Sequence, residues 1–127
     1  PHFAVIREDK ATTKVRVVFD AAAKFNNVAI NDLMLPGPKL QNNLVKILLQ
    51  FCVEPVVLIA DISEMFLQVS LADSDRKYHR FVWESDDRVD VYEFTRLAFG
   101  MRASPYLACR AVLETADRFG DAFDPEV

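Results

Sequence analysis

Residues 56–69 read Val-Val-Leu-Ile-Ala-Asp-Ile-Ser-Glu-Met-Phe-Leu-Gln-Val, a short apolar run that ends in a carboxylate. The run follows Pro55 and is rich in β-branched residues, which is typical of a strand buried on both faces. Asp61 stands at its end, and a buried carboxylate needs a partner because burying an unpaired charge is very unfavourable. A metal ion is one such partner. We therefore predict a buried strand over residues 56–60 and a partnered carboxylate at Asp61.

Four other segments have the composition of β-strands and fall into two pairs. The strands are expected over residues 2–7, 14–19, 78–83 and 88–95. Polar connections over residues 8–13 and 84–87 separate the members of each pair. Because each connection is short, the simplest arrangement is a β-hairpin at each place.

Two helices and one long connection complete the prediction. Residues 39–51 carry apolar side chains at helical spacing, namely Leu40, Leu44, Ile47, Leu48 and Phe51. Ser104 is a good N-cap with Pro105 at the first helical position, and Gly120 is placed to end that helix. Residues 20–38 contain polar breaks and a Pro-Gly-Pro turn signal, which predict a connection. This order places the chain in the α+β class, with one mixed or antiparallel sheet backed by helices.

The composition excludes several classes of protein. No apolar stretch approaches the ~18 residues of a membrane span, and the first residues lack a signal-peptide pattern. We therefore expect a soluble domain that is not secreted and has no membrane partner. Cys52 and Cys109 lack the spacing of a zinc site or a disulfide framework, so both are expected to be small core residues.

The charge is distributed unevenly along the chain. The formal net charge of −4 counts against nucleic-acid binding, which needs clustered Lys and Arg. Residues 1–50 carry seven Lys and Arg against four Asp and Glu (+3), whereas residues 51–127 carry eight against fifteen (−7). A basic half that meets phosphates beside an acidic half that holds cations is one interpretation. A chance asymmetry on a solvated surface is the other.

Several segments together resemble the fingers and palm of a retroelement reverse transcriptase. They occur in the order and spacing of that family, at residues 14–20, 31–42, 56–69 and 92–105. Residues 36–42, Pro-Gly-Pro-Lys-Leu-Gln-Asn, and residues 104–108, Ser-Pro-Tyr-Leu-Ala, look most like the BEL/Pao branch of long-terminal-repeat retrotransposons. The resemblance covers nearly the whole chain.

The resemblance implies a partial right-hand polymerase fold, in which a fingers hairpin accompanies an incomplete palm sheet backed by helices. Residues 1–127 would form one partial reverse transcriptase domain, with about 1–50 fingers-like and about 51–127 belonging to palm and fingers. The family's second carboxylate motif, Tyr-x-Asp-Asp, does not occur in these residues. We therefore expect a piece of a longer polymerase that is inactive by itself.

The resemblance also assigns roles around Asp61. Nucleotidyl transfer uses two divalent cations held by carboxylates, and Mg²⁺ prefers oxygen ligands. Asp61 is implied as the first of these ligands, with the Ile62 carbonyl as a second. The backbone near Glu64 and Met65 is expected to turn sharply and to present N–H groups to the triphosphate. Phe66 matches the aromatic position that leaves no room for a 2′-hydroxyl and so selects deoxynucleotides.

Two further pairs of residues are implied to meet the nucleotide. Arg16 and Lys14 reach from the fingers to its phosphates, and Phe99 and Gly100 lie against its base and ribose and against the template. Simpler interpretations remain open: Asp61 as a cap of the following turn, Phe66 as ordinary core, and the Lys-x-Arg pair as a solvated strand face.

The predicted function is template-directed deoxynucleotidyl transfer by an RNA-directed DNA polymerase with two Mg²⁺ ions in the intact parent. Its partners would be an RNA or DNA template with a primer, deoxynucleoside triphosphates and the rest of the retroelement polyprotein. An intracellular location, cytoplasmic or nuclear, is expected for such an enzyme. The alternative is a truncated or co-opted retroelement remnant that acts at most as a binding module without catalysis.

Overall fold

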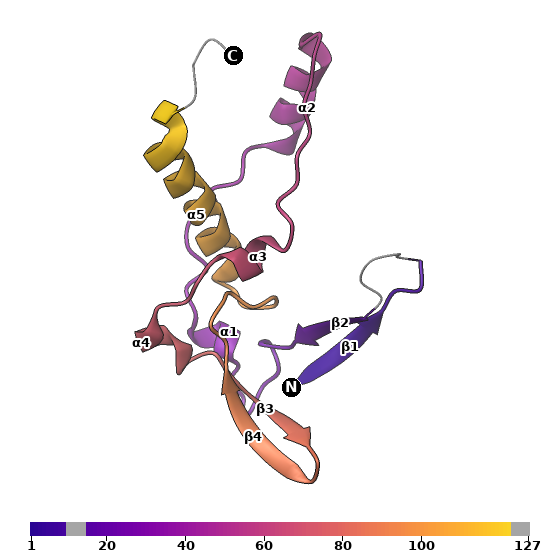
Figure 1. Ribbon diagram of the computed structural model, residues 1–127, viewed down its shortest axis with the longest axis vertical. Coiled ribbons are helices and arrows are strands. Elements are labelled where there is room, and N and C mark those ends of the chain that lie inside the picture. The colour runs from indigo at the N-terminus through magenta and orange to yellow at the C-terminus, as the bar shows by residue number, and fades with distance from the viewer. Residues whose placement is uncertain (10–14, 123–127) are drawn as a thin grey trace.

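The computed structural model describes residues 1–9 and 15–122 and shows a chain of the α+β class (Figure 1). Two hairpins and two longer helices extend from a central junction in different directions (Figure 1). The elements, in chain order, are β1 (His2–Ile6), β2 (Val15–Phe19), α1 (Ile30–Leu33), α2 (Leu44–Val53), α3 (Met65–Gln68), α4 (Asp73–Arg76), β3 (Arg80–Ser85), β4 (Arg88–Glu93), α5 (Ser104–Phe119) and a 3-10 turn (Gly120–Ala122).

Both predicted hairpins are confirmed, but they form two separate two-stranded antiparallel sheets instead of the single sheet predicted. β1 pairs with β2 so that His2 lies opposite Phe19, and β3 pairs with β4 so that Arg80 lies opposite Glu93. The second hairpin turns at Asp86 and Asp87, whose φ angles are 50° and 62°. Positive φ at both central residues gives the type I′ geometry that matches strand twist, which explains a two-residue connection.

The buried strand predicted over residues 56–60 is wrong. The segment is extended but unpaired within the described part of the chain, and Leu58 and Ile59 are 88% and 87% exposed. A strand needs backbone hydrogen bonds from a neighbouring strand. Here β1 pairs only with β2, and β3 pairs only with β4, so neither hairpin supplies a partner for residues 56–60. The apolar run therefore lacks a surface to cover it, and Asp61 is exposed with it.

Helix α2 begins later than predicted, because the side chain of Asn43 accepts hydrogen bonds from the backbone N–H groups of Val45 and Lys46. Residues 20–38 form the expected connection, which includes α1 and a tight turn at Asn26 and Asn27. Figure 1 shows α2 and the segment after it reaching away from the hairpins.

Helix α5 spans the predicted residues, but its ends differ in detail. Ala103 is the N-cap, and the buried Ser104 hydroxyl instead donates to the Ala98 carbonyl at 2.8 Å. Gly120 keeps right-handed angles (φ −58°) and leads into the 3-10 turn, so it ends the α-helix without a left-handed cap. The end of the helix at Gly120 is as predicted, whereas the N-cap is Ala103 and not Ser104.

Two small clusters of buried side chains form the core at the junction. One contains Ala21, Ala98 and Met101, the other contains Leu71, Leu97 and Ala108, and the half-buried Phe94 packs against both. Backbone hydrogen bonds from Leu97 N–H to the Val69 carbonyl and from Leu71 N–H to the Thr95 carbonyl join the segments before and after the second hairpin. Arg96 adds to this connection by donating hydrogen bonds to the Gln68 carbonyl and to Ser70 Oγ.

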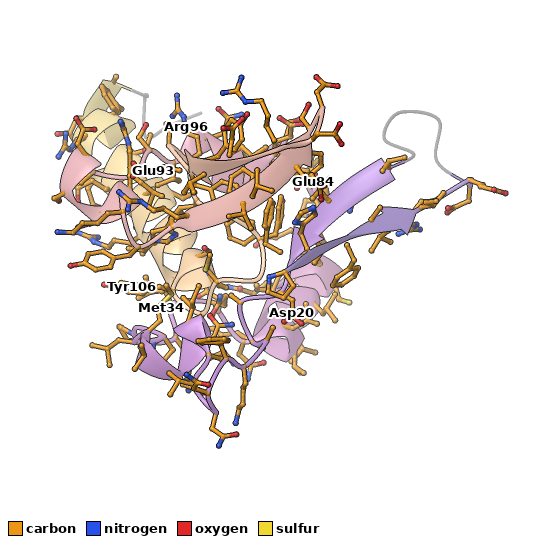
Figure 2. All side chains as sticks on the ribbon, turned by 90° about the horizontal axis from the view of Figure 1, so that it is seen from below. Asp20, Met34, Glu84, Glu93, Arg96 and Tyr106 are labelled. Atoms are coloured by element: carbon orange, nitrogen blue, oxygen red, sulfur yellow. The ribbon has the colours of Figure 1, made fainter. Side chains whose placement is uncertain are left out.

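The region after α1 meets the start of α5. Met34 Sδ accepts a hydrogen bond from the Ala103 N–H at 3.3 Å, and Gly37 packs directly against the ring of Tyr106. Figure 2 labels Met34 and Tyr106 at this contact. None of the helices in residues 1–9 and 15–122 has both the length and the apolar character needed to cross a membrane.

Candidate functional site

A cleft of about 510 Å³ opens between β2 and α3 and is bounded on a third side by Phe99. We call it the β2–α3 cleft. Its lining comes from residues 15–18, residues 64–67 and Phe99, which are widely separated in the sequence. The residues on this lining that the sequence predicts to meet a nucleotide are Arg16, Glu64, Met65, Phe66 and Phe99.

Strand β2 supplies the cationic wall of the cleft. Arg16 lies in the middle of β2, opposite Val5, and its side chain is exposed. Among the described residues no carboxylate or backbone carbonyl pairs with its guanidinium, so its five N–H donors are available to a ligand. Lys14, the other predicted phosphate ligand, lies outside the described residues.

Aromatic contacts fix β2 against the second hairpin. The ring of Phe19 lies 5.0 Å from that of Phe81 and 4.7 Å from that of Phe94, centroid to centroid. His2 stacks on Trp83 with centroids 4.9 Å apart. Aromatic pairs of this kind each contribute about 0.5–1.5 kcal/mol beyond their buried area, so the cationic wall is held by a rigid cluster.

The opposite wall begins at a sharp turn. Glu64 has left-handed backbone angles (φ 51°, ψ 40°), and its carbonyl accepts a hydrogen bond from the Leu67 N–H at 2.7 Å. Such angles are uncommon for a residue other than glycine, asparagine or aspartate. The turn brings Met65 and Phe66 onto the cleft immediately after the extended segment that contains Asp61.

Phe66 and Phe99 form an edge-to-face pair across the cleft, with centroids 4.9 Å apart and planes at 85°. Phe66 is half-buried and also packs against the core cluster of Leu71, Leu97 and Ala108. Phe99 is 48% exposed and is therefore accessible to a ligand. The same Phe66 ring thus has a core contact and a cleft surface, so the two interpretations of this residue are compatible.

Gly100 places the Phe99 loop directly against β2. Its φ is +90°, and a Cβ atom at this position would collide with the carbonyl oxygen of Phe19. Only glycine tolerates both conditions. The close approach of the two backbones thereby sets the separation between Phe99 and β2.

Asp61 and Ile62 lie just before the α3 wall but outside the lining of the cleft. The Asp61 carboxylate is exposed and makes no hydrogen bond or ion pair with any other described residue, which differs from the partnered group predicted. The Ile62 side chain lines a different groove of about 660 Å³ between α3 and α5. Residues 1–9 and 15–122 contain no group of three or more His, Cys, Asp or Glu side chains that could together hold a metal ion.

Asn31 is a contributor that sequence reasoning missed. Its side-chain Nδ2 donates to the Gly100 carbonyl at 2.9 Å, and its Oδ1 accepts from the Arg102 N–H at 2.8 Å. In the sequence Asn31 and Asp32 mark a polar break and begin one of the segments that resemble the family, but neither residue is assigned a role there. No local pattern indicates a partner 69 residues away, so only the folded chain identifies this contact.

Comparisons with protein-family models, with curated proteins and with solved structures find no match to this chain. The cleft combines a guanidinium with no partner among the described residues, an edge-to-face pair of rings and a tightly turned backbone. Together these suit a ligand with a phosphate end and a flat apolar end.

Proposed function

We propose that the β2–α3 cleft binds a 2′-deoxynucleoside triphosphate and that this chain is the fingers and first palm segment of an RNA-directed DNA polymerase of a retroelement. One observation supports this most strongly. Arg16, Phe66 and Phe99, to which the family resemblance assigns contacts with one nucleotide, come from distant segments and line a single cleft.

The chemistry of the lining fits the three parts of such a ligand. The planar guanidinium of Arg16 pairs two phosphate oxygens at once, which an ammonium group cannot do. Phe99 offers an exposed face on which a base can stack. Phe66 presents a ring that is anchored in the core, and a fixed ring beside the sugar rejects a 2′-hydroxyl by collision.

Asp61 and the Ile62 carbonyl would hold Mg²⁺ beside the triphosphate. The donor set fits this ion in part, since Mg²⁺ prefers oxygen ligands and completes its shell with water and substrate phosphates. The exposed Asp61 carboxylate, without a hydrogen bond or ion pair to the described residues, is available for such a ligand role. Bound Mg²⁺ would act as a Lewis acid on the phosphate oxygens.

The charge distribution fits the proposed macromolecular partners. Residues 1–50, which include β2, carry a net charge of +3, whereas residues 51–127 carry −7. A basic fingers segment attracts the phosphates of a primer and template, and this attraction weakens as salt rises. The polymerase product would be DNA copied from an RNA or DNA strand.

Nucleotide binding by residues 1–127 tests the proposal. Isothermal titration calorimetry with each of the four deoxynucleoside triphosphates and Mg²⁺ should show weak binding. Arg16→Ala should raise the dissociation constant about tenfold or more for all four nucleotides alike. Arg88→Ala is the matched control, because Arg88 is also exposed on a strand but lies outside the cleft. Equal losses for both variants, or a loss confined to one base, would contradict a phosphate role for Arg16.

Primer extension by the product of the whole open reading frame tests the polymerase assignment. Asp61→Asn keeps the side-chain shape and removes the charge, so it should abolish extension with Mg²⁺ or Mn²⁺ while leaving the fold intact. Phe66→Ala should instead let ribonucleotides be incorporated. Extension by Asp61→Asn near the wild-type rate would show that this carboxylate is not a metal ligand of the reaction.

A further inference from the structure

The geometry points to Asn31 as a positioning residue that controls sugar discrimination in the β2–α3 cleft, an inference that rests on the proposed function. Asn31 lies on α1 outside the cleft lining and would not touch the nucleotide. It acts instead through the loop that carries Phe99.

The amide of Asn31 fastens this loop at two places. Its Nδ2 donates to the Gly100 carbonyl at 2.9 Å, and its Oδ1 accepts from the Arg102 N–H at 2.8 Å. One side chain thus satisfies an acceptor and a donor two residues apart on the same backbone. Only an amide has both functions at this length, since aspartate has no donor when ionised and leucine has neither.

The same residue is fastened to the segment that follows β2. The backbone N–H of Asn31 donates to the Ala21 carbonyl at 3.1 Å, two residues after Phe19. Phe19 in turn is the residue whose carbonyl the Gly100 backbone approaches. Asn31 therefore holds together the strand that carries Arg16 and the loop that carries Phe99, which are two of the three walls of the cleft.

The position of Phe99 matters for Phe66. The two rings meet edge to face with centroids 4.9 Å apart, and Phe99 is the aromatic neighbour of Phe66 on the cleft side. If the loop shifts, Phe66 loses this neighbour and gains freedom to move away from the sugar. A sugar gate that can move rejects a 2′-hydroxyl less strongly.

The test is the ratio of dissociation constants for ATP and 2′-deoxyadenosine triphosphate, each measured with Mg²⁺ on residues 1–127. The variants are Asn31→Asp, which keeps the acceptor and removes the donor, and Asn31→Ala. We expect the ratio to fall roughly three- to tenfold, the factor that an aromatic pair of this kind contributes. Asn31→Asp preserves volume, so it provides the measurement if Asn31→Ala does not fold.

Asn43→Ala is the matched control. Like Asn31, Asn43 makes two side-chain hydrogen bonds to the backbone, in this case by accepting from the N–H groups of Val45 and Lys46. It lies at the start of α2 and outside the cleft lining. A loss of overall stability reduces binding of both nucleotides by the same factor and leaves their ratio unchanged. The ratio therefore separates positioning from a general structural role.

A double-mutant cycle with Phe99→Leu tests whether Asn31 affects sugar discrimination through the Phe99 ring. If Asn31 acts through the Phe99 ring, Asn31→Asp should change the ratio little once that ring is gone. An unchanged ratio in Asn31→Asp, an equal change in Asn43→Ala or full additivity with Phe99→Leu would overturn the inference while leaving the proposed function intact. Failure of the wild-type chain to bind either nucleotide would instead overturn the proposed function and this inference with it.

Discussion

The junction and the arm of this molecule both contain many apolar residues but differ in how far those residues are buried. We define the junction as residues 15–34, 65–79 and 94–108, which include both core clusters, and the arm as residues 44–60. In the junction Leu97 is 1% exposed, whereas in the arm Leu49 and Leu58 are 63% and 88% exposed. Both regions are apolar, so hydrophobicity alone does not decide burial. A segment is buried only where other segments supply a surface, and the junction receives several of them.

The total surface shows the same contrast. The described structure exposes 10894 Å². A compact monomer of 14.5 kDa would expose about 6,900 Å² by the usual size scaling. The excess fits the elements that project from the central region in Figure 1.

The largest expected effect compares a core leucine with an exposed one. Leu97→Ala should lower the free energy of unfolding by about 2–5 kcal/mol, because it opens a cavity in the core. Leu58→Ala should change it by less than about 0.5 kcal/mol, because the side chain contacts mainly solvent. Urea unfolding followed by Trp83 fluorescence measures both. Similar losses at the two positions would show that the arm is packed in solution.

Alanine substitution should have opposite effects on stability at two glycines, Gly100 in the junction and Gly120 at the end of α5. Gly100→Ala should cost about 1–3 kcal/mol for its left-handed angle and more for the collision with Phe19. Gly120→Ala should be neutral or stabilising by up to about 1 kcal/mol, since Gly120 has right-handed angles and open space around it. The same urea experiment applies, and a Gly100→Ala protein as stable as the wild type would contradict the close approach of the two backbones.

His79 gives the junction a pH dependence. Burial lowers the pKa of His79, and the charge of Asp75 opposes this only in part. The folded state therefore keeps the ring neutral, and the unfolded state takes up a proton first as the pH falls. Stability should be fully present above about pH 6.5, the ordinary value for His, and should decline as the pH falls toward the lowered pKa of the folded state.

The two histidines provide the measurement and its control. The decline in unfolding free energy between about pH 7 and pH 6 should become smaller in His79→Gln. The same substitution at the exposed His2 should leave the decline in place. A decline that is unaltered in His79→Gln would mean that another group is responsible.

The smallest expected effect on the unfolding free energy is that of a charge introduced into the arm. Leu58→Lys should leave the unfolding free energy nearly unchanged and should reduce self-association, because an exposed apolar segment with unpaired backbone groups promotes aggregation. Size-exclusion chromatography with light scattering compares the two proteins. If the wild-type protein and Leu58→Lys self-associate equally, the arm is not the surface through which the chains associate.

The parts of the fold that were predicted correctly, the two hairpins and α5, depend on residues that are close together in the sequence. The strands of each hairpin follow one another in the sequence, with His2 opposite Phe19 and Arg80 opposite Glu93. Helix α5 was predicted from the residues at its ends, so both kinds of element are predictable from nearby residues. Residues 56–60 differ because their burial depends on a distant neighbour. The buried strand was inferred from the apolar run itself, which carries no information about that neighbour.

The residues of the candidate site likewise fall into those that the sequence identified and those that only the structure identified. Arg16, Phe66 and Phe99 were assigned by the family resemblance, and all three line one cleft in the structure. Asn31 and the contact of Gly100 with Phe19 depend on tertiary structure across long sequence separations. Side chains that shape a site from outside its lining have no local signature, which is why sequence reasoning missed them.

Mapping the binding of 2′-deoxyadenosine triphosphate by NMR is the most direct test of the central claim. We expect that, with Mg²⁺ present, the backbone amide signals of Arg16, residues 64–66 and Phe99 shift on titration, while those of the arm and of the second hairpin's turn stay in place. Shifts confined to the groove between α3 and α5, or no shifts at all, would contradict the assignment of the β2–α3 cleft as a nucleotide site.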